Sequence, residues 1–221
     1  MNLNINGYDN FIFDCDGVIL DSNSVKSEIF YETLSDENES YRKQFIEYHH
    51  LNTGISRYRK FDYYFSHIKK QNDYKKELDF LLKRFSSLLY EKFLKCSLTK
   101  GVEDLLQYLN QSDKNVVLVS ASDEIELISI FKQRSLDKYF NTILGSPKDK
   151  IMNIKSLVSI ENNIDKSIFF GDSKSDYDAA KYFKIDFVFI SRYSMWKVPE
   201  NIKKCREFIE IEDFSKICLN Q

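Results

Sequence analysis

The sequence predicts an α/β fold in which helices flank a parallel sheet and an all-helical unit is inserted after the first strand. Short apolar runs rich in Val, Ile and Phe alternate with segments of helical periodicity. One long stretch, residues 22–94, interrupts this alternation and contains no strand-like run. Strands that alternate with helices are typical of a parallel sheet covered on both faces.

Five apolar runs are predicted to be buried strands. Each is too short for a helix and ends in a polar or glycine-containing turn. The runs are residues 10–13, 116–120, 141–144, 167–170 and 187–190. Helices are predicted over residues 124–134, 150–160 and 175–183.

The interrupting stretch is predicted to form a helical cap domain. Its apolar stripe at helical spacing indicates packing rather than a cofactor site. The stripe consists of Leu81, Phe85, Leu88, Leu89 and Phe93. We expect a core domain of residues 1–20 and 96–221 and a cap domain of residues 21–95. A cap inserted there would lie over the strand ends, where open α/β sheets bind ligands.

Composition excludes several classes of partner. The 221-residue chain has a net charge of −2, which offers no electrostatic attraction for nucleic acids or anionic membranes. No apolar run approaches the roughly 20 residues that span a bilayer, and the first ten residues do not resemble a secretion signal. The four cysteines are widely spaced and form no metal-binding pair. We expect a cytoplasmic protein whose oligomeric state the sequence leaves open.

Polar residues collect where the predicted strands end. They are Asp14 and Asp16 after the first strand, Ser120 and Ser122 at the end of the second, Lys148 and Lys150 after the third, and Asp172, Ser173 and Asp176 after the fourth. Parallel strands present their carboxyl ends at one edge, so these groups are expected to converge. Each alone is typical of a helix cap or a turn. Together they favour a binding site in which oxygen ligands hold a hard divalent cation and a lysine is available for an anionic ligand.

The order and spacing of these motifs resemble the haloacid dehalogenase-like hydrolases. The matching residues are Asp14-Cys15-Asp16-Gly17-Val18, Ser120, the segment GSPKDK at 145–150, and Gly171-Asp172-Ser173 with Asp176. The helical insertion resembles the cap of the phosphoglycolate phosphatase and β-phosphoglucomutase branch. The resemblance implies a Rossmann-like core, Mg²⁺ as cofactor and a small phosphorylated metabolite as substrate.

The resemblance also implies roles for the acids. Asp14 would attack phosphorus to form an aspartyl-phosphate, and its other oxygen would bind Mg²⁺. Asp16 would act as general acid and base, with its backbone carbonyl as a second metal ligand. Asp172 would be the third ligand. Asp176 would lie outside the metal shell or orient the lysine.

Further residues are expected to hold the phosphoryl group. Ser120, with Gly17 and Ala121, would bind its oxygens. Lys150 would neutralise the clustered charge, because it begins the predicted helix; Lys148 is the alternative two residues earlier.

The insertion contains Gly54-Ile55-Ser56-Arg57, which resembles the specificity loop of β-phosphoglucomutases. Arg57 could hold a substrate carboxylate or phosphate bidentately. An equally open alternative is a solvent-facing arginine that follows a helix-capping serine. Lys26 stands where these mutases have a histidine, which weakens the mutase interpretation.

Three hypotheses follow. The favoured one is a Mg²⁺-dependent phosphatase acting on a small phosphorylated metabolite, with a sugar phosphate as one option. A phosphomutase of the β-phosphoglucomutase type and a non-catalytic phosphate-binding module are the alternatives. The carboxylate at Asp16 favours phosphoryl chemistry over dehalogenation.

Overall fold

A computed structural model describes residues 3–161, 164, 166–205 and 208–219. Its centre is a six-stranded, fully parallel sheet of order β4-β3-β2-β5-β6-β7. The strands are β2 (Asn10–Phe13), β3 (Asn115–Asp123), β4 (Thr142–Ser146), β5 (Ser167–Gly171), β6 (Asp186–Ile190) and β7 (Phe208–Ile211). The predicted α/β class is confirmed.

The five predicted strands are present, and β7 was missed. Only its first and last residues are buried, and it lies at the sheet edge, so no continuous buried apolar run marks it. A second small sheet was not predicted either. It pairs β1 (Leu3–Asn4) with β8 (Ile217–Cys218), and two-residue strands are too short to show periodicity.

Helices cover both faces of the large sheet. On one face lie α5 (Val102–Gln111) and α6 (Glu124–Gln133), and on the other α7 (Lys150–Glu161) and α8 (Lys174–Phe183). Short helices follow: η2 (Asp137–Tyr139), α9 (Glu200–Lys203) and η3 (Phe214–Lys216).

Strand β2 shows how its sequence builds two cores. Phe11 and Phe13 pack against the α5 and α6 side, whereas Ile12 packs against α7 and α8. This follows from the two-residue side-chain period of a strand. Burying each of these three side chains contributes about 1.5–3 kcal/mol, so β2 is anchored from both faces.

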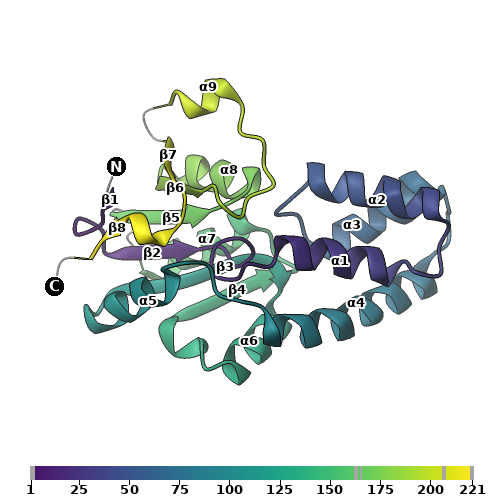
Figure 1. Ribbon diagram of the computed structural model, residues 1–221, viewed down its shortest axis with the longest axis horizontal. Helices are drawn as coiled ribbons and strands as arrows, with labels where there is room; N and C mark the ends of the chain where they lie inside the picture. Colours follow the sequence, from purple (N-terminus) through teal and green to yellow (C-terminus); the bar gives the residue numbers. More distant parts are fainter. Residues whose placement is uncertain (1–2, 162–163, 165, 206–207, 220–221) are drawn as a thin grey trace.

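The insertion between β2 and β3 is helical throughout, as predicted. It comprises α1 (Asn23–Thr33), α2 (Glu39–Leu51), α3 (Arg57–Tyr63), the π-helix η1 (Tyr64–Lys69) and α4 (Lys75–Lys95). Figure 1 shows this group extending beyond one end of the sheet, with both termini at the other end. The chain enters and leaves at neighbouring points, since the Asp21 amide donates to the Ser97 carbonyl at 3.0 Å. The proposed boundaries of the two domains stay a prediction.

Aromatic side chains form the interior of the insertion. The rings of Phe30 and Phe85 lie 4.5 Å apart and those of Phe45 and Phe61 lie 5.4 Å apart. The predicted stripe on α4 packs into this interior, with Leu88 only partly buried. Among the described residues, none of the helices has both the length and the apolar character that crossing a membrane requires.

The sheet topology explains where the acids meet. From β2 the chain passes to β3 and β4 on one side, then to β5, β6 and β7 on the other. Phe13 is in register with Leu118 of β3 and with Phe170 of β5. The residues that follow these strands therefore emerge side by side at a topological switch point, where such folds bind ligands.

Candidate active site

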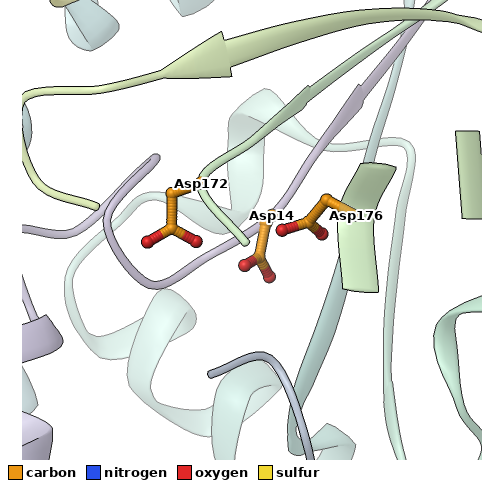
Figure 2. A group of neighbouring side chains, drawn as sticks. All are labelled: Asp14, Asp172 and Asp176. Atoms are coloured by element: carbon orange, nitrogen blue, oxygen red, sulfur yellow. The ribbon is translucent and has the colours of Figure 1, made fainter. Parts of the chain in front are cut away.

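Three buried carboxylates meet at this edge. Asp14 follows β2, Asp172 follows β5, and Asp176 lies in the first turn of α8. Their ligand atoms lie within 4.8 Å of one another. Figure 2 shows Asp14 between the other two. The Asp14 amide extends the parallel ladder by donating to the Phe170 carbonyl at 3.0 Å, which fixes the backbone at this point.

The structure brings Lys150, and not Lys148, to these acids. Lys150 is the first residue of α7, and its Nζ lies 3.0 Å from Asp14 Oδ2 and pairs with Asp176 Oδ1. Burial by itself would lower the pKa of Lys150, but the two carboxylates hold it above its usual value. Lys150 is therefore a buried, permanent cation beside Asp14.

Asp176 orients this lysine from the start of α8. Its Oδ2 accepts hydrogen bonds from the Ser173 amide at 3.0 Å and the Ser173 hydroxyl at 2.6 Å. The bond from the Ser173 amide is one half of a capping box, which satisfies a free amide at the helix N-terminus. Both oxygens of Asp176 are thus engaged.

The cluster carries more negative charge than Lys150 neutralises. Asp14 Oδ1 is buried and has no hydrogen-bond partner among the described residues. Burial, and then the charge of Asp176, raise the pKa of Asp14 to about 7. Burial, and then Asp14, hold the pKa of Asp172 well above its ordinary range. An unpaired carboxylate oxygen among crowded buried acids is a setting that a hard divalent cation would stabilise. The residues present fit Mg²⁺.

Asp16 lies apart from the three acids in its own network. Its carboxylate accepts from Ser22 Oγ at 2.7 Å and from Lys26 Nζ at 2.5 Å. Lys26 Nζ also donates to Ser122 Oγ at 2.8 Å. Burial would raise the pKa of Asp16, but Lys26 outweighs this and the pKa lies below its usual value. Asp16 is thus held as a carboxylate.

Sequence reasoning missed the partners supplied by α1. Besides Lys26, Asn23 donates its amide to Asp172 Oδ2 at 2.6 Å and to the Tyr193 carbonyl at 2.8 Å. The two residues are three apart at the start of one helix, so they share a face. Their position directly behind the first motif, at the start of the insertion predicted to be helical, was the signal that could have identified them.

The three predicted phosphate-binding residues, Ser120, Ala121 and Gly17, lie in different surroundings. Ser120 is fully buried, and its Oγ accepts from the Ser122 amide at 3.1 Å. Ala121 lines the cleft described below. Gly17 has a φ of +73°, and a side chain there would collide with Asn23 and Asp172. Its amide donates to the Leu20 carbonyl at 2.7 Å and is therefore used within the loop.

Arg57 forms an ion pair within the protein, with Glu126. Its guanidinium donates to both oxygens of Glu126 on α6, at 2.6 and 2.8 Å. The neighbouring Tyr58 hydroxyl donates to Asp123 Oδ2 at 2.7 Å. The arginine side chain is only 6% exposed and does not line the cleft. Its contact with substrate stays a prediction.

A cleft of about 190 Å³ lies between the insertion and the strand ends. Its lining includes residues 54–56 and Arg59 of the insertion and Ala121, Lys148 and Lys150 of the sheet side. Gly54 has a φ of +77°, and a side chain there would collide with the Ser173 and Ser175 hydroxyls. Glycine therefore lets this loop lie directly against the turn that carries Asp172.

Residues 11–190 match the family description of the haloacid dehalogenase-like hydrolases. This range covers most of the chain and includes all the acids described above. The chain belongs to this hydrolase family. None of the curated proteins matches it.

Solved structures similar to this haloacid dehalogenase-like hydrolase share its fold at low identity. A predicted phosphoglycolate phosphatase from Haemophilus somnus has a TM-score of 0.75 and 18% identity over 96% of each chain. CbbY from Rhodobacter sphaeroides, in complex with phosphate, has a TM-score of 0.72 and 12% identity over 94% of this chain and 95% of its own. A proposed β-phosphoglucomutase from Thermotoga maritima has a TM-score of 0.66 and 15% identity over 94% and 96%.

The family match confirms the predicted family, and the solved structures confirm the predicted fold. They include proteins described as a phosphatase and as a mutase, so likeness of fold does not separate the two activities. The phosphatase and mutase activities must therefore be distinguished by the contacts that this chain's own residues make.

Proposed function

We propose that this hydrolase is a Mg²⁺-dependent phosphatase that releases phosphate from a small phosphorylated metabolite through an aspartyl-phosphate. One observation carries the proposal. Asp14 is buried with Oδ2 held 3.0 Å from Lys150 Nζ, while Oδ1 has no partner among the described residues. A carboxylate fixed in place with a free oxygen beside a cation is suited to attack phosphorus.

Asp14, Asp172 and the backbone carbonyl of Asp16 would hold the metal ion. When bound, Mg²⁺ supplies neutralisation of the charge on the transferring phosphoryl group. Lys150 contributes a second positive charge, already oriented by Asp176. The Ser120 hydroxyl, whose oxygen accepts from the Ser122 amide, would donate its proton to a phosphoryl oxygen.

Asp14 and Asp16 divide the chemistry between them. Asp14 forms a bond to phosphorus as the bond from phosphorus to the leaving oxygen breaks, and Asp16 in its acid form protonates that oxygen. Asp16, now a carboxylate, takes a proton from the water that attacks the aspartyl-phosphate, and Asp14 is released with inorganic phosphate. For the first step Asp16 must gain a proton, so its bond with Lys26 must loosen when substrate binds.

This catalytic cycle consumes only the phosphate ester and water, and it regenerates Asp14 as a carboxylate and Asp16 in its acid form. A cytoplasmic location is part of the proposal, and it rests on the composition rather than on the site.

The test compares wild-type protein with Asp14→Asn, using p-nitrophenyl phosphate and a panel of phosphorylated metabolites with Mg²⁺ present. We expect Asp14→Asn to lose about 10³-fold or more in turnover. Asp113→Asn, the same change at an exposed turn residue, serves as the matched control. A phosphorylated Asp14 peptide should appear by mass spectrometry in quenched wild-type reactions.

Three outcomes would overturn the proposal. A loss of less than about tenfold, or 1.4 kcal/mol in barrier, would show that Asp14 is not the nucleophile. Conversion of a sugar phosphate without phosphate release would indicate the phosphomutase. Binding of phosphate esters with no turnover of any of them would indicate a non-catalytic module.

A further inference from the structure

Two cations in addition to Lys150 line the cleft between the insertion and the strand ends. Arg59 comes from α3, and Lys148 comes from the loop between β4 and α7. They belong to opposite walls of the cleft. Neither has a part in the phosphoryl transfer described above.

The geometry of α3 separates Arg59 from Arg57. Two residues along an α-helix are rotated by roughly 200° about its axis, so the two side chains leave on opposite sides. Arg57 points to Glu126 and is buried. Arg59 is 69% exposed and borders the cleft. The insertion's available cation is therefore Arg59.

Neither Arg59 nor Lys148 has a strong carboxylate partner among the described residues. Lys150 is neutralised by the buried acids, and Asp178 on the cleft wall is paired with Lys174 at 2.5 Å. Arg59 reaches Asp149 only at 3.6 Å, in an exposed pair that contributes little. Lys148 forms no ion pair with any residue that the structure describes. Arg59 thus has one weakly bound carboxylate partner, and Lys148 has none among the described residues.

We propose that Arg59 and Lys148 form a subsite for a second anionic group of the substrate, a carboxylate or a second phosphate. This inference rests on the proposed phosphatase function and narrows its substrate class. The phosphoryl group would lie at Asp14 and Lys150, and the remote anion would lie between Arg59 and Lys148. Arginine offers a planar fork for such oxygens, and lysine a compact charge.

The cleft limits the part of the substrate that lies beyond the phosphoryl group. Its volume is about 190 Å³, and Lys150 but not Asp14 lines it. The expected substrate is therefore a phosphomonoester whose remaining part is small and carries an acidic group at its far end. Neutral sugar or polyol phosphates are the disfavoured class.

The test uses three probes on one three-carbon frame: glycerol phosphate, phosphoglycerate and propanediol bisphosphate. They differ in whether the remote group is a hydroxyl, a carboxylate or a phosphate. We expect wild-type protein to prefer one or both acidic probes. Arg59→Ala and Lys148→Ala should each raise KM for the preferred probe about 5- to 10-fold, and the double variant about 50-fold, the range of charge-assisted hydrogen bonds. Values of kcat should stay within about twofold.

Selectivity of the effect distinguishes a subsite from a fold defect. The same variants should change KM for glycerol phosphate, and turnover of p-nitrophenyl phosphate, by no more than about twofold. Arg59→Lys should recover part of the loss. Lys83→Ala, at an exposed lysine of α4, is the matched control and should alter nothing.

The outcomes separate this inference from the proposed function. If KM of the Arg59 and Lys148 variants rises only for phosphoglycerate, or only for the bisphosphate, this result supports the subsite and identifies its anion. Equal losses on all probes, or no preference in the wild type, overturn the subsite. If p-nitrophenyl phosphate is not hydrolysed, the phosphatase proposal fails. Calorimetric binding of the same three probes then decides the subsite: tighter binding of the acidic probes that requires Arg59 and Lys148 supports it, and equal binding overturns it.

Discussion

The guanidinium of Arg57 is bound by both carboxylate oxygens of Glu126, at 2.6 and 2.8 Å. This pair joins the first turn of α3 in the insertion to the first turn of α6. Helix α6 begins directly after the segment from Ser120 to Asp123, whose last residue caps it. Buried Arg57 therefore links the position of the insertion to that of the predicted phosphate-binding turn, through Glu126 and, at 3.9 Å, through Asp123.

A double-mutant cycle on this pair should show strong coupling. Arg57→Met and Glu126→Gln each leave the other side chain partly buried without its charge partner, so each should destabilise the protein by about 1–3 kcal/mol. The double variant should lose less than the sum of the two, by about 1 kcal/mol or more. Denaturant unfolding measures the stabilities.

Activity in the same cycle separates a structural role of Arg57 from a substrate contact. If Arg57 acts through Glu126, both single variants should lower kcat/KM alike and the double variant should be no worse. If Arg57 binds substrate, Glu126→Gln would free it and preserve activity, while Arg57→Met alone would be impaired. That second pattern would return Arg57 to the role predicted from sequence.

Asp172→Asn should weaken Mg²⁺ binding by at least about tenfold, because it removes one anionic ligand from a buried site. Calorimetric titration with Mg²⁺ measures this directly. Asp178→Asn, at an exposed acid of α8, is the matched control. Chelation of the metal should abolish the turnover of wild-type protein, and added Mg²⁺ should restore this turnover. Full turnover in a metal-free preparation would contradict the assignment.

Asp16→Asn should affect the two half-reactions differently. A nitrophenolate leaves without protonation, so the first step with p-nitrophenyl phosphate should survive, while an alkyl phosphate should lose about 10²–10⁴-fold. Hydrolysis of the aspartyl-phosphate needs the same carboxylate as base. Stopped-flow mixing should therefore show a burst of nitrophenol close to one equivalent of enzyme. A uniform loss on both substrates, without a burst, would argue against Asp16 as the acid and base.

Stability should depend on pH through His49, which is buried in the insertion. Its Nδ1 lies 2.6 Å from Lys60 Nζ and its Nε2 lies 3.1 Å from Ser27 Oγ. Burial, followed by the charges of Lys60, His50 and Lys26, holds the pKa of His49 well below its ordinary value of 6.5. The unfolded chain therefore binds a proton below about pH 6.5 that the folded protein does not, and stability should fall as the pH drops through this window.

Thermal unfolding at about pH 5.5 and 7.5, on either side of the ordinary histidine pKa, checks this. His49→Gln should show a smaller decrease of Tm between the two than wild-type protein, because a neutral side chain takes up no proton. His67→Gln, at an exposed histidine, is the control and should follow the wild type. An equal decrease in His49→Gln and wild-type protein would show that His49 does not contribute.

Much of this protein was determined by local sequence patterns. The runs at 10–13 and 167–170 form β2 and β5, and the acids directly behind them meet because parallel strands end at one edge. Lys150 reaches Asp14 because it begins the next helix. These features depend on short-range periodicity and on the order of elements, and both can be read along the chain. Strand β7 was missed because an edge strand needs no continuous apolar run.

The choice of ionic and hydrogen-bonding partners was decided only by the tertiary structure. The chain has 32 lysines and arginines and 34 aspartates and glutamates, and sequence spacing does not indicate which of them pair. Arg57 meets Glu126 across 69 positions, and Asn23 meets Asp172 across 149. Such contacts depend on how the insertion lies against the sheet. A long cationic side chain can reach several acids within a few ångströms, so only the packed arrangement determines that Arg57 is buried and Arg59 is left facing the cleft.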